Sequence, residues 1–191
     1  NWIVGGSGEF AVAPATTIDA DASYFSTHES RTSPDLSVQA LSPTAYTQFH
    51  SDASILNQPG PIGLSACVNY DRFVYDPTVL VGGSLLDNAD RNSNVVEGFA
   101  KALYEFQPEE SVYARLSYNV RDFDQQFDRN GFDHSSDGYR LDTGLQMLFT
   151  PLLKGTMFLG YLQQNFKAPF HSVSGVDFGS QIDWFVTELV K

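Results

Sequence analysis

Carboxylates are the side chains of this chain that come closest to a recognisable binding chemistry. An acidic run near the middle of the chain contains Asp124, Asp128, Asp133 and Asp137. Calcium prefers several oxygen ligands at close range, so these carboxylates form a weak candidate calcium loop. Their spacing does not match an EF-hand, and a solvated loop, or one that faces lipopolysaccharide, is the competing interpretation.

The residue patterns of common catalytic sites are missing. The 4 histidines are scattered and form no His-x-x-x-His or Glu-x-x-His pair, so we do not predict a zinc site. No nucleophile elbow, phosphate-binding loop or dinucleotide fingerprint occurs. The lone Cys67 cannot form an intrachain disulfide and is expected to pack as a small apolar residue. We therefore predict no enzymatic activity and no cofactor.

Most other charged residues alternate with apolar ones. Side chains two residues apart in a strand share a face, so these segments each have an apolar and a polar face. If the strands close into a barrel, the polar faces line its lumen, which gives these candidates: Asp19, Asp21, Asn69, Asp71, Glu97, Lys101, Glu105, Arg115, Asn119, Arg121, Arg140, Asp142, Gln146, Gln181 and Asp183. Two roles stay open for them, selectivity in a polar conduit and salt bridges that hold the wall together.

About nine segments carry this pattern, each near the ~9–11 residues of a tilted membrane strand. The clean ones span 17–26, 62–73, 95–106, 112–122, 139–149 and 176–186. Less clear ones span 2–12, 45–56 and 156–166. The glycine-rich run at 5–8 could instead be a linker, and 156–166 is apolar on both faces, so its orientation stays open.

Turns of two lengths separate the segments. Short turns, mostly with proline, are expected at 13–16, 58–61, 107–110, 150–153 and, more weakly, 187–189, while longer polar loops span 27–44, 76–94, 124–138 and 167–175. This asymmetry is typical of a transmembrane β-barrel. Aromatic residues near both ends of the apolar faces predict two interfacial girdles: Tyr24, Tyr70, Tyr118 and Tyr139 toward the long loops, and Phe106, Phe149 and Trp184 toward the short turns.

Composition narrows the class of protein. The net charge of −12 argues against a nucleic-acid binder, and no apolar run approaches the ~20 residues of a membrane helix. A soluble β-sandwich, for example one that binds carbohydrate, also alternates apolar and polar residues. The long apolar faces and asymmetric loops favour the barrel. The predicted fold is therefore all-β, an antiparallel transmembrane up-and-down β-barrel, with residues 1–191 as a single domain.

Several stretches resemble a known family. The most specific are YNVRDFD at 118–124, NGFD at 130–133, SDGYR at 136–140, GYLQQNF at 160–166 and SGVDFG at 174–179. They are similar to outer-membrane proteins of Gram-negative bacteria of the "putative β-barrel porin 2" type. The resemblance implies an outer-membrane location, a closed barrel, and contact with outer-membrane lipid and lipopolysaccharide. Members are often connected with exopolysaccharide export, which makes polysaccharide and export-machinery proteins the expected partners.

Two functions follow as expectations. The first is a porin-like conduit for polysaccharide export or polar solutes. The second is a non-conducting barrel whose extracellular loops bind or anchor a surface assembly. Because family members are longer and bacterial single-chain barrels have an even number of strands, we expect the chain to be part of a larger barrel. A self-contained barrel of about eight or ten strands is the alternative.

Overall fold

The computed structural model describes residues 1–33, 37 and 39–185. Most of this part is one antiparallel sheet of 9 strands, each paired with its neighbours along the chain. These strands are β1 (Trp2–Ala13), β2 (Thr16–His28), β3 (Ala45–Asn57), β4 (Ile62–Tyr75), β7 (Ser93–Gln107), β8 (Glu110–Phe123), β9 (Ser136–Thr150), β10 (Leu153–Phe166) and β11 (Val173–Trp184). The loop between β4 and β7 holds a small hairpin, β5 (Thr78–Val79) with β6 (Leu85–Leu86), and the 3-10 helix η1 (Ala89–Arg91).

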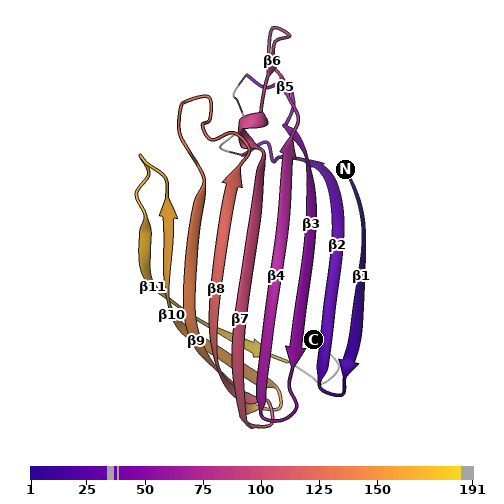
Figure 1. Ribbon diagram of the computed structural model, residues 1–191, viewed down its shortest axis with the longest axis vertical. Helices are drawn as coiled ribbons and strands as arrows, with labels where there is room; N and C mark the ends of the chain where they lie inside the picture. Colours follow the sequence, from indigo (N-terminus) through magenta and orange to yellow (C-terminus); the bar gives the residue numbers. More distant parts are fainter. Residues whose placement is uncertain (34–36, 38, 186–191) are drawn as a thin grey trace.

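The sheet is a single curved wall. Figure 1 shows the strands side by side, with the lower parts of β9, β10 and β11 curling behind the others. In the described residues no second sheet packs against this wall, so the sandwich alternative is wrong. The strands β1 and β11 are its two edges and do not pair with each other in the described part of the chain. The up-and-down antiparallel topology predicted from the sequence is confirmed.

The short turns explain the order of the strands. The predicted turns at 13–16, 58–61, 107–110 and 150–153 each join two adjacent strands at the lower end in Figure 1. Proline cannot donate to a sheet ladder, so it ends a strand and starts the return. The weaker turn predicted at 187–189 lies outside the described residues. All longer loops lie at the opposite end, which we call the loop end.

Two uncertain segments are settled by their pairing. The glycine-rich run lies inside β1, where Gly6 pairs with Ala22 of β2, so the linker interpretation is wrong. In β10, Tyr161 lies opposite Leu141, on the apolar face. Phe158 points to the other face, where it crosses two glycines. A Cβ atom on Gly179 would lie 2.7 Å from the Phe158 ring, so the neighbouring strand leaves room for an inward aromatic side chain.

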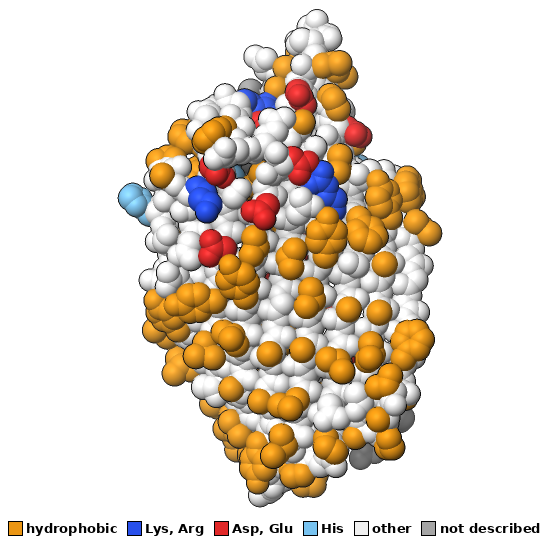
Figure 2. Space-filling model, in the orientation of Figure 1, with side chains coloured by type: hydrophobic (Ala, Val, Ile, Leu, Met, Phe, Trp, Pro, Cys, Tyr) orange, Lys and Arg blue, Asp and Glu red, His pale blue; other side chains and the backbone are white. Residues whose placement is uncertain are grey.

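The two faces differ in chemistry. Cys67 is the one buried hydrophobic residue among those described, because large apolar side chains project from the convex face instead. Near the β11 edge, Phe178 is 77% exposed and Ile182 is 67% exposed. Figure 2 shows this face covered with apolar side chains, with the charged ones gathered at the loop end. In lipid such a face needs no further cover. No helix in the described part of the chain has the length and apolarity to cross a bilayer.

Candidate functional site

The concave face carries the polar side chains. Strand register places every predicted lumen-lining residue on it, from Asp19 on β2 to Asp183 on β11. In one row across the sheet, Asn69, Glu97 and Asn119 are consecutive partners. The two-residue period and the hairpin register therefore bring residues that are distant in sequence onto one surface.

An ion-pair ladder, defined as Arg115, Asp142, Arg140 and Asp177, crosses β8, β9 and β11. The Asp142 side chain has 0% exposure, and Arg115 Nε donates to its two oxygens at 3.0 and 3.1 Å. On its other side, Arg140 Nε lies 3.8 Å from Asp142 Oδ1, and Arg140 Nη2 lies 2.8 Å from Asp177 Oδ2. These charges stabilise the wall by pairing with each other.

Other charges on the same face have no such pairing. Among the described residues, no cationic side chain lies within ion-pair distance of Asp19, Asp21 or Glu97. Lys101 lies opposite Arg115 and places its ammonium 4.6 Å from the centre of the Tyr113 ring. The charges of Asp19, Asp21, Glu97 and Lys101 are therefore not neutralised by an ion pair within the described residues.

Acidic side chains predominate at one side of the concave face. Strands β1 to β3 contain no Lys or Arg, and their concave side carries Glu9, Asp19, Asp21 and Asp52, which we call the acidic wall. The cations Lys101, Arg115, Arg121 and Arg140 of the same face lie on β7 to β9. Sequence analysis did not select Glu9, which follows the possible linker at 5–8, or Asp52, because segment 45–56 is weakly polarised. Asp177 lies on the polar face of the predicted strand 176–186 but was not selected as a candidate.

The predicted calcium loop is held together by its own contacts. The four carboxylates are spread over separate partners: Asp124 pairs with Arg72, Asp128 accepts from the N–H groups of Asn130 and Phe132, Asp133 from the N–H of Ser135, and Asp137 from the amide of Asn165. In the part of the chain that the structure describes, no group of three or more His, Cys, Asp or Glu is arranged to hold a metal ion.

These contacts shift the acidity of the loop carboxyls. The hydrogen bond from the Phe132 N–H, with those from His134 and Asn130, lowers the pKa of Asp128. The Arg72 guanidinium lowers the pKa of Asp124 in the same direction. Both groups are therefore carboxylates at neutral pH, and both act as fixed acceptors that shape the β8–β9 loop.

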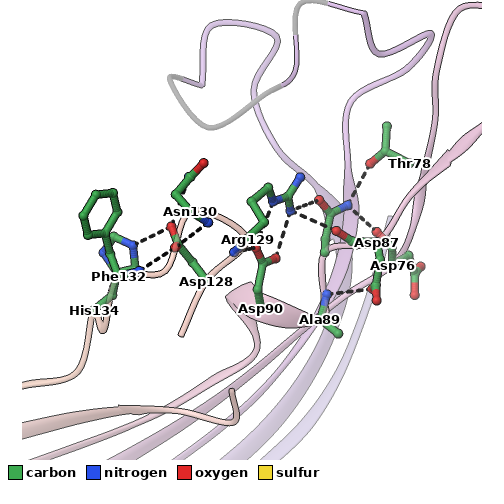
Figure 3. Close-up of polar contacts among 11 residues, drawn as sticks. Asp76, Thr78, Asp87, Ala89, Asp90, Asp128, Arg129, Asn130, Phe132 and His134 are labelled. Carbon is green, nitrogen blue, oxygen red and sulfur yellow. Dashed lines mark hydrogen bonds and ion pairs between the residues drawn. The ribbon is translucent and has the colours of Figure 1, made fainter. Parts of the chain in front are cut away.

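The long loops are tied together by what we call the loop network (Figure 3). Arg129 of the β8–β9 loop donates from Nε and Nη2 to the two oxygens of Asp90 in η1, each at 2.9 Å. These hydrogen bonds lower the pKa of Asp90. Next to this pair, Asn88 is 2% exposed and donates to Thr78 Oγ1 at 3.0 Å. An ion pair between Arg91 and Glu29 adds the β2–β3 loop.

The predicted aromatic girdles can be located residue by residue. On the convex face near the loop end, Tyr24, Tyr118 and Tyr139 are 37%, 51% and 38% exposed. Tyr70 is half-buried, and its hydroxyl donates to Asn94 at 2.7 Å. Nearer the short turns, the exposed rings are those of Phe106, Phe149 and Trp184, at 43%, 51% and 71%.

Two further rings extend the girdle at the loop end. Trp2 lies 5.5 Å from Tyr24, and Tyr161 lies 6.4 Å from Tyr139, measured between ring centres. Both residues lie in segments that were less clear in the sequence, and the orientation of 156–166 was left open. Their place on the convex face follows only once β1 and β10 are paired with their neighbours.

An up-and-down antiparallel sheet with an apolar convex face, a charged concave face, short turns and long loops defines a porin-type β-barrel protein. The chain matches the family described as "putative beta-barrel porin 2" over residues 1–191, and it belongs to that family. No curated protein and no solved structure matches it. Porin-like families are typically non-enzymatic.

Proposed function

We propose that this chain forms the wall of an outer-membrane conduit for polar solutes, and that its cargo includes polysaccharide. One observation carries the proposal: the face turned away from the apolar surface carries charged side chains from Glu9 on β1 to Asp183 on β11, and it keeps charges such as Asp21 and Lys101 without ion-pair partners. A barrel that serves only as an anchor has no need of a hydrated, charged interior.

The charge pattern supports passage of polar and ionic species. The acidic wall on β1 to β3 faces the same interior as the cations on β7 to β9. Hydroxyl-rich polymers exchange hydrogen bonds with such a surface while staying hydrated. The proposed mechanism is passage along the wall rather than catalysis, with outer-membrane lipid on the convex face.

The test is conductance of the full chain reconstituted in a planar lipid bilayer. A steady conductance that a soluble oligosaccharide blocks supports the conduit, and a silent bilayer refutes it. Heat-modifiable migration on an electrophoresis gel serves as the control for folding, because a silent bilayer is informative only when the inserted protein is folded.

A second candidate rests on the loop network. Arg129, Asp90 and Asn88 join loops from different hairpins, and Arg91 with Glu29 adds another. Loops held together in this way present a fixed surface to the outside, which suits a non-conducting barrel that binds a surface assembly or export-machinery proteins. Arg129→Ala distinguishes the two roles. It is expected to raise conductance if the loops restrict a conduit, and to weaken partner capture without any conductance if the barrel is an anchor.

A further inference from the structure

Aromatic rings gather near the loop end of the concave face. A cavity of about 700 Å³ lies where β7 to β10 meet the loop end. Its lining includes Phe123 at the end of β8, Phe166 at the end of β10, and Phe170 in the β10–β11 loop. This volume falls in the ~300–1,000 Å³ range of small-molecule sites.

The rings come from separate segments and contact each other. His134 of the β8–β9 loop lies 5.9 Å from Phe123 and 5.1 Å from Phe170, between ring centres. Phe132 lies 5.8 Å from Phe170 on its other side. Even so, Phe166 keeps 37% of its surface exposed and Phe170 keeps 40%. Exposed ring faces inside a hydrated cavity are available to an apolar surface of a ligand.

A set of hydrogen-bonding side chains lines the cavity beside the rings. Gln164 donates from Nε2 to Asn119 Oδ1 and to Ser136 Oγ, each at 3.1 Å, so its amide is fixed in place. Any side chain at Gly138 would overlap the Gln164 carbonyl oxygen, which explains a glycine at this position of β9. Gln164 is therefore positioned before any ligand arrives.

Other polar groups of the cavity have unused capacity. In the described part of the chain, no residue hydrogen-bonds to the Glu97 carboxylate, the Arg121 guanidinium or the Asn119 Nδ2 group. One carboxylate, one guanidinium and one free amide supply acceptors and donors side by side. The formal charges of Glu97 and Arg121 cancel. These two residues together therefore favour neither an anion nor a cation in the cavity.

The cavity continues along the wall. A second cavity, of about 360 Å³, shares Glu97, Asn119 and Gln164 with the first and extends to Arg115 and Arg140 of the ion-pair ladder. Two adjoining cavities that share one set of polar side chains form a groove rather than a pit. A chain of linked units fits such a groove better than a single compact ligand does.

We propose that this groove is a binding subsite for a neutral hexose oligosaccharide. The apolar C–H face of a pyranose ring stacks on Phe166 and Phe170, and its hydroxyls bond to Glu97, Asn119 and Gln164. The inference rests on the proposed function for the class of cargo, and it adds a place where that cargo is held. The balanced charges of Glu97 and Arg121 favour a neutral sugar over a uronate.

The test is isothermal titration calorimetry on the full chain in a zwitterionic detergent whose head group is not a sugar. The probes are a β-1,4-linked glucose hexamer and a galacturonate hexamer. We expect the glucose hexamer to bind and the galacturonate to bind more weakly. Phe170→Ala is expected to weaken binding by about fivefold, in line with the loss of one aromatic stacking contact. Phe170→Leu keeps an apolar side chain without a ring and should lose affinity as well.

Phe127→Ala is the matched control, since Phe127 is 55% exposed in the β8–β9 loop and does not line this cavity. Its affinity should equal that of the parent. Absence of glucose-hexamer binding, equal losses in the Phe127 and Phe170 variants, or tighter binding of galacturonate each overturns the inference. Conductance of the same preparation separates the two proposals. Binding without conductance supports the subsite and refutes the conduit. Conductance without binding supports the conduit and refutes the subsite.

Discussion

Asp142 is the residue on which the ion-pair ladder depends. Its side chain is completely buried between two arginines and receives hydrogen bonds from Arg115. Asp142→Asn keeps the shape of the side chain, removes its charge, and turns one acceptor into a donor that faces a guanidinium. The arginines then lie near each other with no anion between them.

The cost can be worked out from burial. Removing one partner of a buried ion pair costs about 3–5 kcal/mol. The Arg115 and Arg140 side chains are 34% and 32% exposed, so water partly replaces the lost carboxylate. We therefore expect Asp142→Asn to lower the free energy of unfolding by about 2 kcal/mol. Asp19→Asn makes the same change at an exposed site without an ion pair and should cost no more than about 0.5 kcal/mol.

Urea unfolding of the full chain in lipid vesicles measures this difference. Tryptophan fluorescence reports on both edges of the sheet, because Trp2 lies in β1 and Trp184 in β11. The midpoint should fall for Asp142→Asn with little change in the slope of free energy against urea. Equal midpoints for the Asp142 and Asp19 variants would refute the view that the ladder stabilises the wall.

Three more outcomes are expected. The hydrogen bonds of Arg129 lower the pKa of Asp90 below its ordinary 3.8, so the stability from this pair is complete above that pH and is lost only as pH falls through the lowered pKa. Pepsin cleavage of the β8–β9 loop, normalised at each pH to cleavage of an unfolded substrate, should be slow at about pH 4.5 and rise only as the pH falls below 3.8; equal normalised rates contradict this. Gly144→Ala, whose Cβ overlaps a tyrosine ring, should lower the free energy of unfolding by about 1–3 kcal/mol, against about 0.5 for Gly6→Ala in open space; equal urea midpoints would argue against it. Asp21→Asn should move the reversal potential in a salt gradient toward zero, since it removes a negative charge from the acidic wall, and an unchanged potential would exclude this role.

The strands could be predicted from the sequence where the alternation of apolar and polar residues assigns each side chain to a face. In β4 and β8 the apolar and polar residues alternate without exception over most of the length, and proline turns mark where each hairpin reverses. In β10 both faces contain large apolar residues. Phe158 is tolerated inside because glycines lie beside it on β9 and β11, and this depends on strand register that no single segment contains.

The candidate site likewise has a part that could be predicted from the sequence and a part that could not. The face on which Arg115 and Asp142 lie follows from the two-residue period, so both could be selected from sequence. Their contact depends on the register across the β8–β9 hairpin, whose loop is too long and irregular to count through. The cavity was out of reach for a further reason: Phe170 and His134 come from loops, where side-chain direction follows no period.

The glycines that line the inside of β9 to β11 have a consequence for the size of the barrel. When a sheet curls, its concave side has less room for side chains than its convex side. Three glycines on this side leave space for a larger side chain on the neighbouring strand: Gly144 for Tyr113, Gly160 for Asp142, and Gly179 for Phe158. The inward side chains that fill this room limit how tightly this part of the wall can curl. Larger side chains at these positions in related proteins would change the curvature of this part of the wall, even where every charged residue stayed the same.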